Sequence, residues 1–180
     1  MSLTNQRPDT AAAFTALADA KCVDAKLFRE AMSRLGAAVH VITTDGPKGR
    51  AGITATAACS VSDSPPTVLI CVNRAAATAT MLQGNGVFCL NTLRAGDEPV
   101  ADTFAGRTKV AREARFETGE WTELSTGAPV LTSAVVAFDC RVADVKSVAS
   151  HDIYFGVVEA VYSGEPGAAL VYHDRLYKQV

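Results

Sequence analysis

The chain has 180 residues, of which 48% are hydrophobic and 20% charged, and its formal net charge is −2. This length suits one domain with a sizeable core, since a chain of about 150 residues buries roughly 70% of its extended surface. The balanced charge argues against a general nucleic-acid-binding protein, no apolar run reaches the ~18 residues of a membrane-spanning helix, and the first residues lack the order of a secretory signal. We expect a cytoplasmic protein.

The N-terminal part predicts two helices. Residues 10–20 are rich in alanine and favour a helix. Asp24 is a candidate N-cap for a second helix over residues 25–35, whose apolar residues recur on one face. Gly36 stands where the C-cap of that helix is expected. The two helices resemble an arm that leads into the domain.

Extended segments follow. Residues 37–44 are β-branched and precede a glycine-rich turn, and residues 50–61 form a second extended run that is dense in threonine and alanine. The proline pair at 65–66 ends this run, because proline lacks the N–H that a strand ladder needs. Residues 67–73 are continuously apolar, which predicts a central strand.

The second half contains fewer helices than strands. Residues 75–83 predict a short helix that glycines stop, residues 87–91 predict a strand, and residues 94–121 form the most helical section. Further strands are expected over residues 134–148, 154–162 and 169–177.

Strands and helices do not alternate regularly, so a doubly wound sheet is not expected. The pattern predicts an α+β, mainly β domain resembling a barrel, with about seven strands and three or four helices. We assign residues 1–24 to the N-terminal helical arm and residues 25–180 to the domain.

Common catalytic motifs are absent from the chain. It has no GxGxxG or GxxxxGK[ST] phosphate loop and no GxSxG nucleophile elbow. Its five cysteines include no CxxC pair and its three histidines lie far apart, so neither a disulfide framework nor a metal site is expected. A chain with few polar catalytic candidates is typical of a protein that binds a reactive cofactor.

Residues 52–62 (GITATAACSVS) are small or hydroxylated over an extended run. Such a strand offers backbone N–H and C=O groups to a flat polar ligand, although an ordinary threonine-rich edge strand has the same composition.

These residues also carry a resemblance to a known family. Residues 50–62 and the proline pair that follows resemble the signature of the short-chain flavin reductases, the NAD(P)H:flavin oxidoreductases that supply two-component monooxygenases. The resemblance extends from residue 28 to residue 177. Its other segments are residues 72–74, 91–93, 104–107, 127–131, 138–140, 150–151 and 170–173.

The resemblance implies a split β-barrel that dimerises and holds FMN or FAD in a groove near the subunit interface. It implies hydride transfer from NADH or NADPH to the flavin, with NADH as the preferred donor. It also implies a separate monooxygenase that receives the reduced flavin by diffusion.

The family's flavin contacts carry over to matching residues. Thr54, Ala55, Thr56 and Ala57 would run along the isoalloxazine ring, Ser60 would lie near the ribityl phosphate, and Cys71, Val72 and Asn73 would contact the pyrimidine side. Backbone amides at such positions stabilise the charge that develops as the ring is reduced.

One segment departs from the family pattern. Related sequences often present several hydroxyls after the central strand, whereas residues 75–77 are alanines and only Thr78 keeps a hydroxyl. Phosphate binding would then depend on Thr78, on backbone amides of residues 75–77, and on Arg74 or Arg107.

Other candidates follow from the same resemblance. His151 matches a histidine that faces the nicotinamide, and its expected role is positioning, although the acidic residue that often precedes it is missing. Phe104 would either pack on the flavin or fill the core. Arg107 belongs to a basic stretch that either contacts a nucleotide phosphate or forms a solvated face, and Tyr177 would lie close to the nicotinamide site.

Two alternative functions remain open from the sequence. A flavin-dependent reductase of another acceptor, such as a corrinoid or a ferric chelate, would use the same fold, and so would a non-catalytic flavin-binding protein. The choices between FMN and FAD and between NADH and NADPH also stay open.

Overall fold

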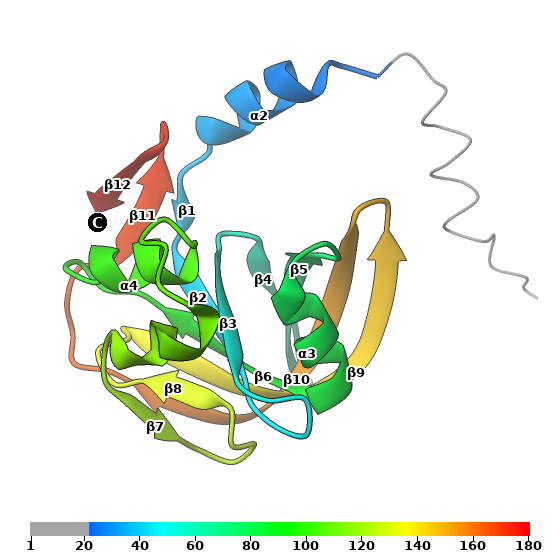
Figure 1. Ribbon diagram of the computed structural model, residues 1–180, viewed down its shortest axis with the longest axis vertical. Coiled ribbons are helices and arrows are strands. Elements are labelled where there is room, and N and C mark those ends of the chain that lie inside the picture. Colours follow the sequence, from blue (N-terminus) through cyan, green and yellow to red (C-terminus); the bar gives the residue numbers. More distant parts are fainter. Residues whose placement is uncertain (1–21) are drawn as a thin grey trace, which may run out of the picture.

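The computed structural model describes residues 22–180 (Figure 1), so the helix expected over residues 10–20 lies outside them. Its helices are α2 (Ala25–Ser33), α3 (Ala77–Asn85), α4 (Glu98–Phe104) and the 3-10 helix η1 (Arg112–Glu117). Its strands are β1 (Ala37–Ala38), β2 (His40–Thr44), β3 (Ala51–Ala55), β4 (Ala58–Asp63), β5 (Pro66–Asn73), β6 (Val87–Thr92), β7 (Trp121–Glu123), β8 (Pro129–Leu131), β9 (Val136–Val148), β10 (His151–Ser163), β11 (Leu170–His173) and β12 (Leu176–Gln179).

Seven strands form one antiparallel sheet in the order β3-β2-β6-β9-β10-β5-β4. Strands β3 and β4 follow each other in the chain, yet they lie at opposite edges of this sheet. Two residues, Thr56 and Ala57, connect them. Such a short link requires the sheet to curl until its two edges approach each other, and they approach without pairing. This is the mainly β split barrel that the family resemblance implies.

Helix α3 spans the gap that the unpaired edges leave. It packs against β2 and β3 on one side, and on the other side the hydroxyl of Tyr154 in β10 donates to the carbonyl of Ala79 at 3.2 Å. Leu82 of α3 is fully buried in a cluster with Ile70 and Phe88. Helix α3 therefore connects β2 and β3, at one edge of the curled sheet, with β10, near the other edge, through the core of the barrel.

A second core cluster lies beneath α4 and the small β7–β8 sheet. Phe104 of α4 is 1% exposed and contacts Phe116 and Trp121 edge-to-face, with ring centroids 5.0 and 5.4 Å apart. The hydroxyl of Thr54 in β3 donates to the carbonyl of Ala101 at 2.7 Å. These contacts hold the C-terminal end of α4 beside the free edge of β3.

Three strand expectations need correction. The run over residues 50–61 is not one strand but the two edge strands β3 and β4. The apolar strand β5 is not central but lies next to the edge, because β4 folds back on it as a hairpin. Residues 169–177 form the hairpin β11–β12, whose turn residues Asp174 and Arg175 have φ of 50° and 62°. Both central residues of a tight hairpin turn need positive φ, and these two are not the Asn-Gly or Asp-Gly pair that marks such turns in a sequence.

The helix ends are predicted less well than the helices themselves. The Asp24 carboxylate accepts from the backbone N–H of Lys26 at 2.8 Å, which confirms the N-cap of α2. The C-cap, however, is Arg34 and not Gly36. Helix α3 begins two residues later than expected and continues past Gly84 to Asn85, and Gly86, the second glycine of the predicted stop, ends it with a φ of 70°. Residues 22–180 form twelve strands where seven were expected, because three expected strands are each divided in two and the short strands β7 and β8 were not expected.

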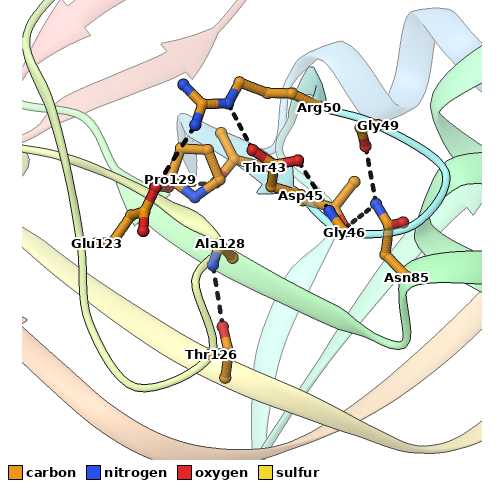
Figure 2. Close-up of polar contacts among 11 residues, drawn as sticks. Thr43, Asp45, Gly46, Gly49, Arg50, Asn85, Glu123, Thr126, Ala128 and Pro129 are labelled. Atoms are coloured by element: carbon orange, nitrogen blue, oxygen red, sulfur yellow. Dashed lines mark hydrogen bonds and ion pairs between the residues drawn. The ribbon is translucent and has the colours of Figure 1, made fainter.

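A polar network fixes the turn between β2 and β3 (Figure 2). Arg50 pairs with Asp45 at 2.7 Å and with Glu123 of β7 at 3.5 Å. Asn85, the last residue of α3, donates to the carbonyl of Gly49 at 2.9 Å and accepts from the N–H of Lys48 at 2.8 Å. The network therefore ties the turn to the end of α3 and to the small sheet.

We expect Asn85→Ala to lower the free energy of unfolding by about 0.5–1.5 kcal/mol, because it removes hydrogen bonds to backbone groups of the turn that are exposed and that water satisfies in part. Urea unfolding followed by circular dichroism measures this loss. Gln83→Ala, at an exposed position of the same helix, is the matched control and should stay within ~0.5 kcal/mol of the unchanged protein. Equal effects of the two substitutions would contradict the role given to Asn85.

His40 in β2 contributes a pH dependence to folding. Its Nδ1 lies 3.0 Å from the hydroxyl of Thr92 in β6. Burial disfavours the charged ring and lowers the pKa of His40 from 6.5 to about 4. The unfolded chain binds this proton at a higher pH than the folded chain does, so stability present above pH 6.5 is lost as the pH falls toward 4.

Replacing this side chain by His40→Gln should therefore flatten the decline in stability below neutral pH. Urea unfolding at about pH 7.5 and about pH 4.5 would measure the difference for both proteins. His173→Gln, in the β11–β12 hairpin, serves as control and should keep the unchanged protein's decline. The role of His40 is wrong if its variant loses as much stability on acidification as the unchanged protein.

Candidate flavin-binding groove

Two adjoining cavities follow the free edge of β3 and together form a groove. The first, of about 230 Å³, lies between the end of β3 and the β11–β12 hairpin. The second, of about 400 Å³, lies between β3, the N-terminus of α3 and η1. Both are lined by Ala105, directly after α4, so they meet there.

The first cavity brings together five predicted site residues from distant parts of the chain. They come from the end of β3, from the segment after α4 and from β12. The five are Thr54, Ala55, Thr56, Arg107 and Tyr177, and the remaining lining residues are Val39, Ala105 and Tyr172.

The second cavity contains two more predicted residues and a basic cluster. Thr78 and Phe104 line it, with Ile53 and the alanines at the start of α3. Arg112 and Arg115 of η1 also line it, together with Glu113, which pairs with Arg112 at 3.2 Å. Among the described residues, the Nε atom of Arg115 is buried and has no hydrogen-bond partner. A buried guanidinium nitrogen without a partner is costly, so this end of the groove suits an anion.

The start of α3 adds to the same positive field. Its N-cap, Ala76, has no side-chain hydrogen bond to the first turn, so the first backbone N–H groups of the helix are not capped by a side chain. A helix N-terminus carries a partial positive charge and favours a negative group. Thr78 is oriented inward, with its hydroxyl 3.3 Å from the carbonyl of Gly52.

Gly52 of β3 is limited in size by the Phe104 ring, which lines the second cavity. A Cβ atom on Gly52 would lie 2.6 Å from Cε1 of Phe104, closer than real contacts allow. Any larger residue there would displace the Phe104 ring. Because β3 pairs only with β2, its other edge presents backbone N–H and C=O groups to the groove side.

A polar cluster closes the first cavity on its outer side. The hydroxyl of Tyr177 donates to the Asp102 carboxylate at 2.9 Å, and Arg107 donates to the same oxygen at 2.9 Å. The Arg107 guanidinium lies 5.5 Å from the ring centroid of Tyr177 and 6.0 Å from that of Tyr172. Burial and the bond to Asp102 raise the pKa of Tyr177 to about 12, so its hydroxyl stays protonated.

The other predicted residues lie elsewhere around the curled sheet. Val72 is 2% exposed and belongs to the core, so it can reach a ligand only through its backbone. Ala57 is exposed, and its carbonyl accepts from the N–H of Cys71 at 3.0 Å. Ser60 of β4 lines a different cavity, on the same face of the sheet as the α3 core cluster, with Val68 and Leu90 of that cluster.

His151 begins β10 directly opposite Asn73 of β5. Its ring is exposed, and its Nδ1 lies 2.9 Å from the hydroxyl of Ser150. The side chain of Asn73 accepts from the N–H of Ala75, just before α3. His151 is thus linked through Asn73 to the α3 end of the groove, although it lines neither cavity.

Sequence reasoning missed several groove residues. Asp102 and Tyr172 organise Arg107 and Tyr177, yet neither was a candidate. Arg112 and Arg115 were seen only as part of a basic stretch. A 3-10 helix of six residues leaves little periodic signal, so the direction of these two arginines could not be predicted from the sequence.

Within residues 22–180, no helix is both long enough and apolar enough to cross a membrane. The same residues contain no group of three or more metal-ligating side chains.

Comparison with known proteins agrees with this geometry. Residues 32–180 match the flavin reductase like domain. A curated relative from Methylorubrum populi, FMN reductase (NADH) RutF, is 54% identical over 156 residues, which is 87% of this chain and 76% of the relative.

Solved structures show the same fold. BorF, the flavin reductase component of a bacterial two-component tryptophan halogenase, superimposes with a TM-score of 0.81 at 28% identity, over 87% of this chain and 98% of BorF. The Streptomyces globisporus NADH:FAD oxidoreductase SgcE6, solved with NAD and FAD fragments, gives 0.79 at 28% identity over 89% and 97%. With its groove, its split barrel and a family match over most of its length, this chain belongs to the flavin reductase like domain family.

Proposed function

We propose that the protein is an NADH-dependent FMN reductase. The observation that carries this proposal is the groove along the free edge of β3, with exposed backbone at one end and an unpartnered buried guanidinium nitrogen at the other. Such a groove suits a flat polar ring joined to a phosphate. The curated relative named above carries the same activity in its name.

The residues present fit FMN. Arg115, Arg112 and the amides at the start of α3 would hold the phosphate, with Thr78 beside them. The backbone of Thr54 to Ala57 would run along the isoalloxazine ring. The backbone rather than the Thr54 side chain would make this contact, because the Thr54 hydroxyl already donates to a carbonyl of α4. When bound, flavin supplies the hydride-accepting chemistry of the reaction.

The protein's own contribution is binding, orientation and electrostatics. Backbone N–H groups of the β3 edge would stabilise negative charge on the ring. Arg107 and Tyr177, fixed by Asp102, would shield the outer side of the first cavity. His151 would orient the nicotinamide, and no side chain needs to move a proton for hydride transfer.

The same proposal includes a partner protein, an oligomeric state and a location for the enzyme. The reduced flavin would pass by diffusion to a separate monooxygenase, in keeping with BorF, which is the reductase component of a two-component system. We also propose a homodimer and a cytoplasmic location, where nicotinamide cofactors are available.

The deciding experiment is a steady-state assay of NADH and NADPH, each with FMN, FAD and riboflavin, followed by loss of the reduced-nicotinamide absorbance. We expect FMN-dependent oxidation of NADH. Stoichiometric flavin binding without turnover would instead support a carrier. Faster reduction of a corrinoid or ferric chelate than of free flavin would support the other reductase function.

Arg115→Gln should raise the KM for FMN by roughly 10- to 100-fold, since a charge-assisted hydrogen bond contributes about 1.5–3 kcal/mol. Riboflavin has no phosphate, so its KM should change little. Lys109→Gln is the matched control, because Lys109 belongs to the same basic stretch but does not line the cavity. A similar loss with FMN and riboflavin would exclude a phosphate contact.

His151→Ala should lower kcat/KM for NADH about tenfold, equivalent to ~1.4 kcal/mol of lost orientation. Binding of FMN, measured by fluorescence titration, should be unchanged. His173→Ala controls for loss of an imidazole elsewhere. Unchanged NADH kinetics would remove His151 from the site.

A further inference from the structure

Arg74 lies at the corner between β5 and α3, beside the start of β10. It follows β5 directly and stands two residues before Ala76, the N-cap of α3. The family resemblance makes Arg74 a candidate for the flavin phosphate, yet it lines neither cavity of the groove. Its side chain contacts instead the turn between β9 and β10, which ends at His151.

Two hydrogen bonds from Arg74 hold this turn. The backbone N–H of Arg74 donates to the carbonyl of Ser150 at 3.0 Å. Its guanidinium donates to the carbonyl of Ala149, and within residues 22–180 this side chain has no other hydrogen bond and no ion pair. Two consecutive carbonyls of the turn are therefore bonded to one residue.

The backbone of the turn is unfavourable for the residues that form it. Val148 of β9 pairs with His151 of β10, so the turn consists of Ala149 and Ser150 alone. A hairpin turn of this length needs positive φ at its first central residue, and glycine adopts such a φ most easily. Ala149 has a φ of 49°. A residue other than glycine keeps this conformation only where its surroundings fix it, and Arg74 bonds the carbonyl of that residue.

The orientation of His151 depends on the same turn. Nδ1 of its ring lies 2.9 Å from the hydroxyl of Ser150, so a turn residue holds one side of the imidazole. The Nε2 atom has no hydrogen bond to the described part of the chain and is available to a ligand. Any movement of the turn would displace both the Ser150 hydroxyl and the backbone of His151.

We propose that Arg74 is a positioning residue, which acts on the nicotinamide through the β9–β10 turn and His151 and does not bind the flavin phosphate. The proposal rests on the role of His151 in the proposed function. It also relates the two ends of the site to one corner of the fold. That corner is short and internally bonded, since the side chain of Asn73 accepts from the N–H of Ala75 at 2.9 Å and its carbonyl from the N–H of Ala76 at 2.9 Å.

The first test is a double-mutant cycle of NADH kinetics at saturating FMN. Arg74→Met keeps most of the side-chain length without the donor, and should lower kcat/KM for NADH roughly three- to tenfold through lost orientation. In a protein that already carries His151→Ala, the same substitution should have no further effect, because its effect passes through the imidazole. Arg74→Lys keeps a donor and should recover most of the loss.

The second test changes the backbone of the turn. Glycine adopts positive φ without strain, so Ala149→Gly should make the turn less dependent on Arg74, and Arg74→Met should lower kcat/KM for NADH less in that background. Arg29→Met is the matched control, because Arg29 is an exposed arginine of α2 that lines neither cavity. It should leave the kinetics unchanged.

A readout without ligands separates this proposal from the proposed function. The NMR signals of the His151 imidazole, assigned by their loss in His151→Ala, are recorded for the full chain without flavin or nicotinamide. Arg74→Met should shift them toward the values of a histidine in an unfolded peptide, whereas the signals of His40 and His173 should stay in place. Circular dichroism checks that each variant is folded.

Three results would overturn the proposal. A raised KM for FMN with an unchanged KM for riboflavin shows that Arg74 binds the phosphate. A full loss of NADH kinetics in the His151→Ala background shows that Arg74 acts by another route, and unshifted imidazole signals show that it does not fix the turn. If the unchanged protein does not oxidise NADH with FMN, the nicotinamide role fails with the proposed function, and the imidazole signals still decide whether Arg74 fixes the turn.

Discussion

The short link between β3 and β4 constrains most of this structure. Two residues connect strands that lie at opposite edges of a seven-stranded sheet. The sheet must therefore curl, its edges must stay unpaired, and the gap must be filled by something other than a strand ladder. Helix α3 fills it, with Leu82 in the core and Ala79 bonded to Tyr154. The same constraint leaves β3 and β4 as edge strands, each with one side of its backbone unpaired within the sheet.

Much of the fold was readable from the sequence because local signals agree with it. The Asp24 cap, the β-branched strand before residue 45 and the proline break at 65–66 each report a local backbone preference. The division of residues 50–61 was not readable, since threonine and alanine suit either one strand or two. The position of β5 near the edge was also hidden, because it depends on long-range pairing with β10.

The groove residues likewise fall into those that the sequence could predict and those that it could not. Its β3 residues could be predicted from a resemblance that rests on contiguous motifs. The side chains that shape it from outside, Asp102, Tyr172 and Arg115, lie on separate elements and meet only in the folded chain. Phe104 has two roles: it packs in the core, and its ring limits residue 52 to glycine.

The open edge of β3 determines which substitutions the proposed site tolerates. In the proposed flavin site, recognition through main-chain groups would require no particular functional group at Ala55 or Ala57, only side chains short enough to leave the backbone accessible. Substitutions there are limited by volume rather than by chemistry. Many different sequences can therefore preserve one ligand contact, and the alanine-rich composition of this chain is one solution among them.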